Sequence, residues 1–451
     1  RVSDELNEVA IGDYLVFGLN QDLSTTTFRD IQRLPPAHTL TISAGSLKLR
    51  RYWTPTIKGE IKFRDNNSYG ERFRELLSVA VNDRLRTDRL AISMSGGLDS
   101  STLAAISCNY LDKESVRGYS VAYDPLLPDQ ERFYSNLAAT HIGIPLTHIN
   151  GNEYSLFEPK APADMDQAEP FLLSPFTGQF HDLLRLSADF SRVAFTGYDG
   201  DAFMTEPPYV YFESAAKRLK FNDLATGISW YMKSQRRLPP IGLRKNLNRI
   251  FKKGAAASYP AWIDESFARR TSLRERVQES LEPKLHDVRP SAFAMLDSKV
   301  WAPLFEGYDP GATKTLLEVR HPFIDLRLVE FLLALPAVPW CVNKHILRVT
   351  AKELLPTSVV NRPKTPLAGD PALQLVRHRS VRCLDIFEVN SQLRCFVNLD
   401  ARQSIANEVT SDGLYASLRV FALNYWLTNS QPIDRLASEQ SINNFALHEK
   451  I

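Results

Sequence analysis

Cysteine is scarce in this sequence, and long apolar runs are missing. The 451 residues include four cysteines without the short spacings of a metal site or the density of a disulfide framework: Cys108, Cys341, Cys383 and Cys395. No run of about 18 apolar residues occurs, which excludes a transmembrane helix. No signal peptide opens the sequence as given. These absences argue against a protein that spans a membrane or depends on disulfides.

An excess of charge of one sign is missing as well. The chain carries 54 basic and 52 acidic residues, which gives a net charge of +2. This balance gives no global indication of a nucleic acid or a membrane as a partner. The nine histidines show no ligand spacing, and no Ser/His/Asp triad can be assembled. The length predicts two or three domains.

One segment departs from this balance. Residues 213–254 contain eleven Lys and Arg residues but only two acids, Glu213 and Asp223. Two interpretations stay open for it: a solvated, mostly helical surface, or a docking face for an acidic or phosphorylated partner. We expect no nucleic acid to bind there.

The most informative segment is residues 93–102, with the sequence SMSGGLDSST. It follows the apolar residues 90–92, which predict a buried strand, and leads into residues 103–106, which predict the first turn of a helix. A strand that passes through Ser-Gly-Gly into a helix presents backbone N–H groups at the positive end of the helix dipole, where phosphates bind. Asp99 would repel a bare phosphate, but it suits a Mg²⁺ ion that lies between the two. The Gly-Lys-Ser/Thr of P-loop ATPases is absent.

A second loop of the same kind spans residues 195–201, with the sequence FTGYDGD. It also follows a predicted strand, so that Asp201 is placed to share a Mg²⁺ ion with Asp99. Strands and helices alternate around both loops, with a strand predicted over residues 118–123 and a helix over residues 131–142. This alternation predicts a doubly wound parallel α/β sheet whose ligand binds beyond the carboxyl ends of the strands.

The flanking regions differ in character. Residues 39–50 alternate around Ala44-Gly45-Ser46, which predicts a β-hairpin. From Ser68 to Leu85 the apolar residues recur at helical spacing. From about Ser291 onward we expect a largely helical C-terminal part.

Three further blocks complete an ordered set: residues 318–325 (EVRHPFID), 344–348 (KHILR) and 361–364 (NRPK). With the two loops, these blocks resemble in order and spacing those of the asparagine synthetase superfamily, whose synthetase domain contains an ATP pyrophosphatase loop. The site pattern is most similar to that of β-lactam synthetases and lasso-peptide cyclases. The resemblance implies a fold of the adenine nucleotide α-hydrolase type that binds ATP and Mg²⁺.

The resemblance also implies roles for individual residues. The expected nucleotide-binding residues lie in the two loops and on the strand beside the adenine: Ser93, Ser95, Gly96, Gly97, Leu98, Asp99, Ser100, Val121 and Gly197. Asp99 and Asp201 would hold Mg²⁺, and Lys364 would stabilise negative charge on the α-phosphate and on the tetrahedral intermediate. Tyr198 and Glu306 would form the base that deprotonates an incoming amine.

The sequence departs from asparagine synthetases at several points. Tyr198 stands where those enzymes usually carry Glu and where β-lactam synthetases carry Tyr. His321 stands at a usually variable position and is interpreted as a packing residue. Lys344 and Arg348 are left open between a role in the site and a pair on a helix surface. Residues 1–58 resemble the closing part of an N-terminal, Ntn-type glutamine amidotransferase domain, but nothing corresponds to its nucleophilic cysteine.

The expected organisation is a truncated, β-rich remnant of that domain over residues 1–58, followed by a synthetase domain over residues 59–451. The expected reaction adenylates a substrate carboxylate with release of pyrophosphate, and an amine then displaces AMP. We expect the amine to belong to the substrate itself, as in a lasso-peptide macrolactam cyclase that works with a precursor peptide and with leader-binding or protease partner proteins. Asparagine synthesis from aspartate and a catalytically silent binding subunit remain as alternatives. The ATP motif and the scarce cysteines indicate the cytoplasm.

Overall fold

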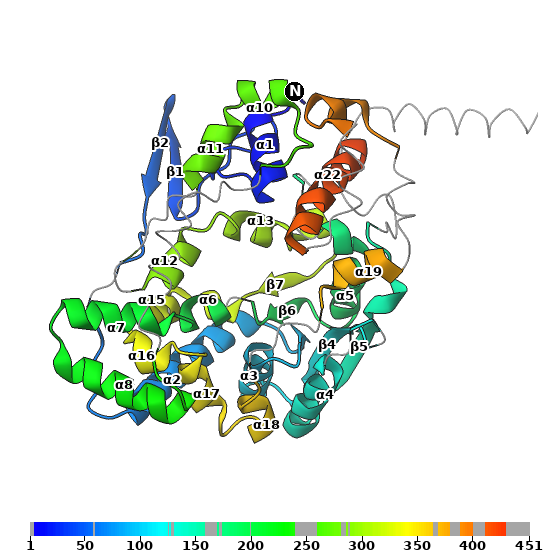
Figure 1. Ribbon diagram of the computed structural model, residues 1–451. Helices are drawn as coiled ribbons and strands as arrows, with labels where there is room; N and C mark the ends of the chain where they lie inside the picture. The colour runs from blue at the N-terminus through cyan, green and yellow to red at the C-terminus, as the bar shows by residue number, and fades with distance from the viewer. Residues whose placement is uncertain are drawn as a thin grey trace, which may run out of the picture.

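In the computed structural model the chain folds around one parallel sheet, and a small separate β-hairpin lies at the edge of the molecule (Figure 1). The residues that it describes are 4–56, 59–124, 126–127, 130–157, 169–170, 174–198, 200–239, 259–280, 286, 289–363, 369–378, 388–399 and 411–429.

The central sheet has five strands in the order β5-β4-β3-β6-β7. The strands are β3 (Leu90–Ser93), β4 (Val116–Ala122), β5 (Leu146–Asn150), β6 (Val193–Thr196) and β7 (Glu318–Arg320). β3 pairs in parallel with both β4 and β6, because after β5 the chain returns to the opposite side of β3. Open α/β sheets bind their ligands at such a switch point. The two loops singled out in the sequence both lie there.

Helices cover both faces of this sheet. Leu90 and Ile92 of β3 join a core cluster with α2 (Asn67–Leu85) and α3 (Leu98–Ser107). Ala91, which lies between them, packs instead with α5 (Thr177–Phe190). Successive side chains of a strand point to opposite faces of the sheet. A strand that is buried on both faces therefore carries a continuous run of apolar residues and does not alternate between apolar and polar ones. The predicted doubly wound α/β fold class is confirmed.

The other helices flank the sheet or build the C-terminal part. They are α4 (Glu131–Ile142), α6 (Gly200–Met204), α7 (Pro208–Lys217), α8 (Phe221–Gln235), α10 (Glu265–Arg270), α11 (Leu273–Ser280), α12 (Pro290–Leu296), α13 (Trp301–Glu306), α14 (Pro310–Thr313), α15 (Leu326–Ala334), α16 (Ala337–Trp340), α17 (His345–Ala351), α18 (Thr357–Val360), α19 (Pro371–His378) and α22 (Ser411–Asn429). None of the helices in the described part of the chain is long and apolar enough to cross a membrane.

The N-terminal segment contains a helix in addition to the predicted hairpin. The hairpin pairs β1 (His38–Ser43) with β2 (Ser46–Arg51) and is almost entirely exposed. The sequence analysis did not predict α1 (Glu8–Phe17). Ile11, Tyr14 and Leu15 of α1 share a core cluster with α11 and α22, and these three helices lie together at the top of Figure 1. Segments from opposite ends of the described chain therefore build one core.

Candidate active site

The loop between β3 and α3 has the form of an anion site. α3 begins at Leu98, directly after the extended residue Gly97 (φ −83°, ψ 162°). The first N–H groups of α3 have no carbonyl partner within the helix, so they are available to an anion at its N-terminus. The Ser100 hydroxyl donates to the Ser95 carbonyl at 3.2 Å, and the Ser101 hydroxyl donates to the Gly97 carbonyl at 2.8 Å. These hydroxyls fix the loop, and phosphate binding by its residues stays a prediction.

Two charged side chains from distant parts of the sequence hold Gly96 in place. Glu131, at the start of α4, accepts from the Gly96 N–H at 2.8 Å. Arg362 donates to the Gly96 carbonyl at 2.9 Å and to Glu131 at 2.8 Å. A Cβ at Gly96 would lie 2.7 Å from both Arg362 and Tyr134, so a side chain would displace this clamp. Sequence reasoning missed Glu131, because nothing in its neighbourhood marks it.

Asp99 and Asp201, which follow β3 and β6, converge on one cation. The ammonium of Lys344 donates to Asp99 and lies 2.9 Å from Asp201 Oδ1. Burial raises the pKa of Asp99, against the opposing effect of the Lys344 charge, and the neighbouring Asp201 raises it further. A Cβ at Gly200 would lie 2.2 Å from Asp99 Oδ1, and one at Gly197 would lie 2.8 Å from the Ser100 nitrogen. The glycines of the second loop thus let the two loops touch.

The two carboxylates fit Mg²⁺ in their donor chemistry. At nucleotide sites Mg²⁺ is commonly held by one or two carboxylates together with phosphate oxygens and water. Asp99 Oδ1 is buried and has no hydrogen-bond partner among the described residues, so it retains lone pairs for a cation. In the described part of the chain no three His, Cys, Asp or Glu side chains gather as a metal site. Among the described residues, Asp99 and Asp201 would therefore be the ligands of the ion.

Lys344 is the site residue that the sequence left undecided. Asn343 and Lys344 both adopt positive φ, at 50° and 57°, which is rare for consecutive residues with side chains. This bend directs Lys344, of which 9% is exposed, into the site at the start of α17. Arg348 donates to the backbone carbonyls of Asn343 at 2.8 Å and Arg362 at 3.0 Å. A pair on a helix surface is therefore excluded for Lys344 and Arg348.

The adenine of ATP is expected to bind beside β4. Val121 lies in β4 and is partly buried. Tyr123, just beyond the strand, donates its hydroxyl to Gln179 at 2.7 Å. The Tyr123 ring covers Gly151, where a Cβ would lie 2.4 Å from the ring. Burial raises the pKa of Tyr123 to about 12, so its phenol stays protonated at neutral pH. The contact between Val121 and adenine stays a prediction.

Tyr198 lies directly beyond β6, next to other aromatic rings. Its side chain is 42% exposed, and its ring centroid lies 6.3 Å from that of Tyr308 and 6.4 Å from that of His321. The phenol is therefore accessible at the same edge of the sheet as Asp201.

Glu306, the expected partner of Tyr198, is the last residue of α13 and forms an ion pair with Arg33 of the N-terminal segment. Arg33 donates to both carboxylate oxygens of Glu306, at 2.8 and 2.9 Å, and to Glu169 at 2.6 Å. Sequence reasoning did not consider Arg33. The pairing of Tyr198 with Glu306 as a base stays a prediction, and Lys364 lies outside the described residues.

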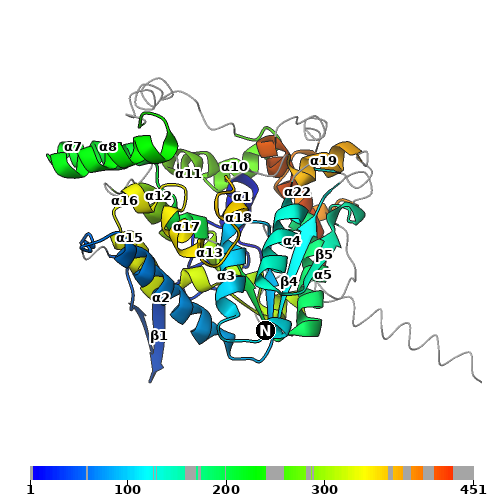
Figure 2. The same ribbon diagram turned by 90° about the horizontal axis from the view of Figure 1, so that it is seen from below.

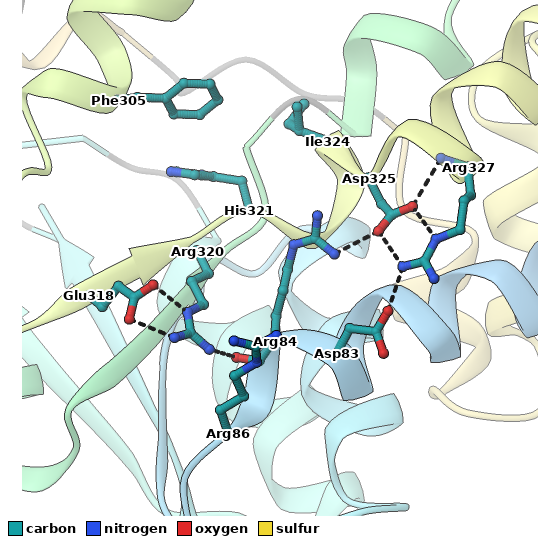
Figure 3. Close-up of a pocket in the computed structure, with 10 residues that line it drawn as sticks. All are labelled: Asp83, Arg84, Arg86, Phe305, Glu318, Arg320, His321, Ile324, Asp325 and Arg327. Carbon is teal, nitrogen blue, oxygen red and sulfur yellow. Dashed lines mark hydrogen bonds and ion pairs between the residues drawn. The ribbon is translucent and has the colours of Figure 1, made fainter. Parts of the chain in front are cut away.

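A pocket of about 590 Å³ lies along β7 (Figure 3). Most of its charged lining is paired: Arg84 and Arg327 both donate to Asp325 at 2.7 Å, and Arg320 donates to Glu318. Arg86 lines the pocket as well. Burial alone would raise the pKa of Asp325, but the two guanidinium groups hold it at about 2. This paired lining therefore stays charged at neutral pH.

His321 and Phe305 form the aromatic end of this pocket (Figure 3). His321 Nδ1 lies 2.6 Å from the Thr196 hydroxyl oxygen, which ties the end of β7 to the end of β6. The imidazole is buried, and its Nε2 has no hydrogen-bond partner among the described residues. Burial, with a smaller effect of Arg84, lowers the pKa of His321 to about 4. A packing role for His321 agrees with these contacts.

This low pKa predicts a pH dependence of stability. Between pH 6.5 and 4 the unfolded chain binds a proton at position 321 that the folded chain does not bind, so unfolding is favoured as the pH falls. The free energy of unfolding of the wild type should fall by up to about 1.4 kcal/mol more per pH unit than that of His321→Gln. Urea titrations of both proteins at several pH values measure this difference, and parallel pH profiles would contradict it.

Comparison with known proteins identifies the family of this chain. The family model of asparagine synthase matches residues 72–386, which include both loops and all three blocks. The chain belongs to the asparagine synthase family. This confirms the predicted superfamily. α1, the hairpin β1–β2 and α22 lie outside the matched residues.

The following proteins share between 12% and 24% sequence identity with this asparagine synthase family member. An asparagine synthetase [glutamine-hydrolyzing] 3 of Bacillus subtilis is 24% identical over 384 residues, which cover 78% of this chain and 56% of that protein. The chain thus spans about half the length of this relative. Among solved structures, the U34-tRNA thiolase NcsA of Methanococcus maripaludis covers 51% of this chain and 78% of its own. The NH3-dependent NAD synthetase of Campylobacter jejuni covers 49% and 99%. Both are 12% identical to this chain, with a TM-score of 0.23.

Proposed function

We propose that this chain is a carbon–nitrogen ligase that adenylates a substrate carboxylate with ATP and passes the acyl group to an amine. The convergence of Asp99, Asp201 and Lys344 at the switch point of the sheet carries this proposal. Two carboxylates and one buried cation lie beside the N-terminus of α3, where phosphates are favoured. The phosphates of ATP would lie on residues 95–100, with the adenine beside Val121.

In the first step an oxygen of the substrate carboxylate attacks the α-phosphorus, and the bond from this phosphorus to pyrophosphate breaks. Lys344 and the N–H groups at the start of α3 stabilise the negative charge that builds up on the departing pyrophosphate. A Mg²⁺ ion held by Asp99 and Asp201 would supply further charge stabilisation at the β- and γ-phosphates.

In the second step the amine nitrogen attacks the acyl carbon, and AMP leaves with the bonding electrons. The amine must give up a proton: Tyr198 is proposed to take it on its phenolic oxygen while it passes its own hydroxyl proton to the carboxylate of Glu306. Lys364 is proposed to stabilise charge on the tetrahedral intermediate. Holding both reactants at one sheet edge contributes by orientation.

We propose further that the amine belongs to the same peptide as the carboxylate, as in a macrolactam cyclase. Tyr198 supports this preference, because it stands where asparagine synthetases usually carry Glu. The precursor peptide and leader-binding or protease proteins would then be partners. Residues 1–58 are proposed to be the remnant of an amidotransferase-like domain.

A mass-spectrometric assay with Mg-ATP, aspartate and ammonia separates the alternatives. Asparagine that appears in equal amounts with AMP would establish asparagine synthesis and contradict the peptide substrate. Absence of AMP from a folded, ATP-binding protein would exclude free aspartate, and precursor peptides with their partner proteins would be tested next. If the protein bound ATP but turned over none of the candidate substrates, this would support a catalytically silent binding subunit.

Tyr198→Phe should slow amide formation by about 10²-fold or more and leave the release of pyrophosphate in the first turnover unchanged. The phenol acts only after the adenylate has formed, and the substitution keeps the ring that contacts Tyr308 and His321. Separate assays of pyrophosphate and of the amide product measure the two steps. Tyr110→Phe, at an exposed position, serves as the control. Equal rates of amide formation in Tyr198→Phe and the wild type would remove Tyr198 from the mechanism.

A further inference from the structure

Helices α7 and α8 form a hairpin that extends beyond the body of the molecule (Figure 2). A small cluster of Phe212 and Tyr231 with Val338 and Val342 anchors it to the segment around α16. Gly227 lets the two helices approach closely, since a Cβ there would lie 3.0 Å from Tyr211. The described contacts thus fix the hairpin at one side.

The body of the protein covers only part of the apolar face of α8. At about 100° per residue, Ile228 continues the buried side of Tyr231, and Phe221 and Met232 extend the same apolar arc outward. Phe221 is 66% exposed and Met232 is 45% exposed. In the turn before α8, Leu219 has a positive φ of 55° and is 70% exposed. Large apolar side chains are thus left uncovered along α8.

Cations lie at both ends of this apolar arc. Residues 208–239 contain six Lys and Arg residues against two acids: Lys217, Arg218 and Lys220 precede α8, and Lys233, Arg236 and Arg237 lie at its end. The two acids form ion pairs with two of these cations, Glu213 with Lys217 at 2.7 Å and Asp223 with Lys220 at 3.7 Å. Six cations against two acids leave a net charge of +4 over these residues. The 15 residues of α8 separate the two groups of cations by about 22 Å.

We propose that the α7–α8 hairpin binds an anionic lipid surface, with Leu219 and Phe221 inserted among the lipids and the cations at the headgroups. An apolar strip between basic ends is the pattern of helices that lie in a membrane interface. A protruding helix meets a flat anionic surface at both basic ends at once, and the lipid chains beneath the headgroups accept large apolar side chains. This proposal does not depend on the proposed reaction.

Co-sedimentation of the full chain with vesicles tests the proposal. We expect binding to vesicles of phosphatidylcholine with 30 mol% phosphatidylglycerol, weakened by salt, and no binding to pure phosphatidylcholine. The double variant Leu219→Ser/Phe221→Ser should bind these vesicles at least about tenfold more weakly than the wild type. Arg236→Glu/Arg237→Glu should lose at least as much. Phe133→Ser, at a position on α4 that is 59% exposed, should bind like the wild type.

Two results would overturn the proposal. The first is a wild type that ignores the anionic vesicles while it binds a poly-glutamate peptide, which would assign the hairpin to an acidic polypeptide. The second is equal vesicle binding by the wild type and Leu219→Ser/Phe221→Ser, which would place the contact elsewhere. Thermal unfolding within about 2 °C of the wild type establishes that each variant is folded.

Discussion

Asp201→Ala should lower the rate of pyrophosphate release by about 10²–10³-fold or more while the protein stays folded. Asp201 is, with Asp99, one of the two described carboxylates proposed to hold Mg²⁺, and its side chain is 41% exposed, so its loss costs little packing. The variant should also lose most of its Mg²⁺-dependent gain in ATP affinity, because Asp99 alone would hold the ion.

Two measurements separate these effects. Isothermal titration with ATP, with and without Mg²⁺, reports binding without need of the acyl substrate, and pyrophosphate release reports the reaction. Asp223→Ala, which removes a partly exposed Asp on α8, serves as the matched control and should resemble the wild type. Normal turnover of Asp201→Ala would show that the metal assignment is wrong.

Arg289→Met should cost about 3–5 kcal/mol of unfolding free energy, because it leaves a buried charge without its partner. Arg289 is 0% exposed and lies 3.5 Å from Glu206, whose side chain is 1% exposed. Arg289 also donates to the carbonyls of Leu332 and, at 2.6 Å, Phe203. One guanidinium thus joins α6, α12 and α15 beneath the Asp201 loop.

Urea unfolding of Arg289→Met and of Arg289→Met/Glu206→Gln measures this cost. The double variant should recover part of the loss, since a neutral Gln is cheaper to bury than an unpaired carboxylate. Arg72→Met, which breaks the exposed ion pair with Glu75, should cost at most about 1 kcal/mol. A loss of less than 1 kcal/mol in Arg289→Met would show that Glu206 is not an isolated charge in this core.

The sequence predicted those features that local pattern determines. The helix expected over residues 131–142 is found with these bounds, and the buried run at residues 90–92 lies in β3. Loops that follow parallel strands lie at one edge of a sheet, so the meeting of Asp99 and Asp201 could be expected from strand order alone. β7, with three residues, is too short to show a period and was missed.

The contacts of the site depend on packing between segments that are distant in the chain. Lys344 reaches Asp99 across 245 positions, and Arg33 reaches Glu306 across 273. Each of these side chains would be an ordinary surface charge in its local sequence, and only the folded arrangement brings it to a partner. The block KHILR marked a neighbourhood but not the direction of the lysine, because that direction depends on two residues with positive φ.

The position of α1 has a consequence for how the chain can be divided. α1 packs between α11 and α22, and it holds Asp13, at 0% exposure, against Arg276 at 2.5 Å. Arg419 of α22 donates to the carbonyl of Val16 at the other end of α1. If residues 1–56 and 59–451 were produced as separate polypeptides, these contacts should make the two fragments complement each other. Co-purification of the pair, with the larger fragment aggregating when alone, would make the N-terminal piece an obligate subunit of the fold.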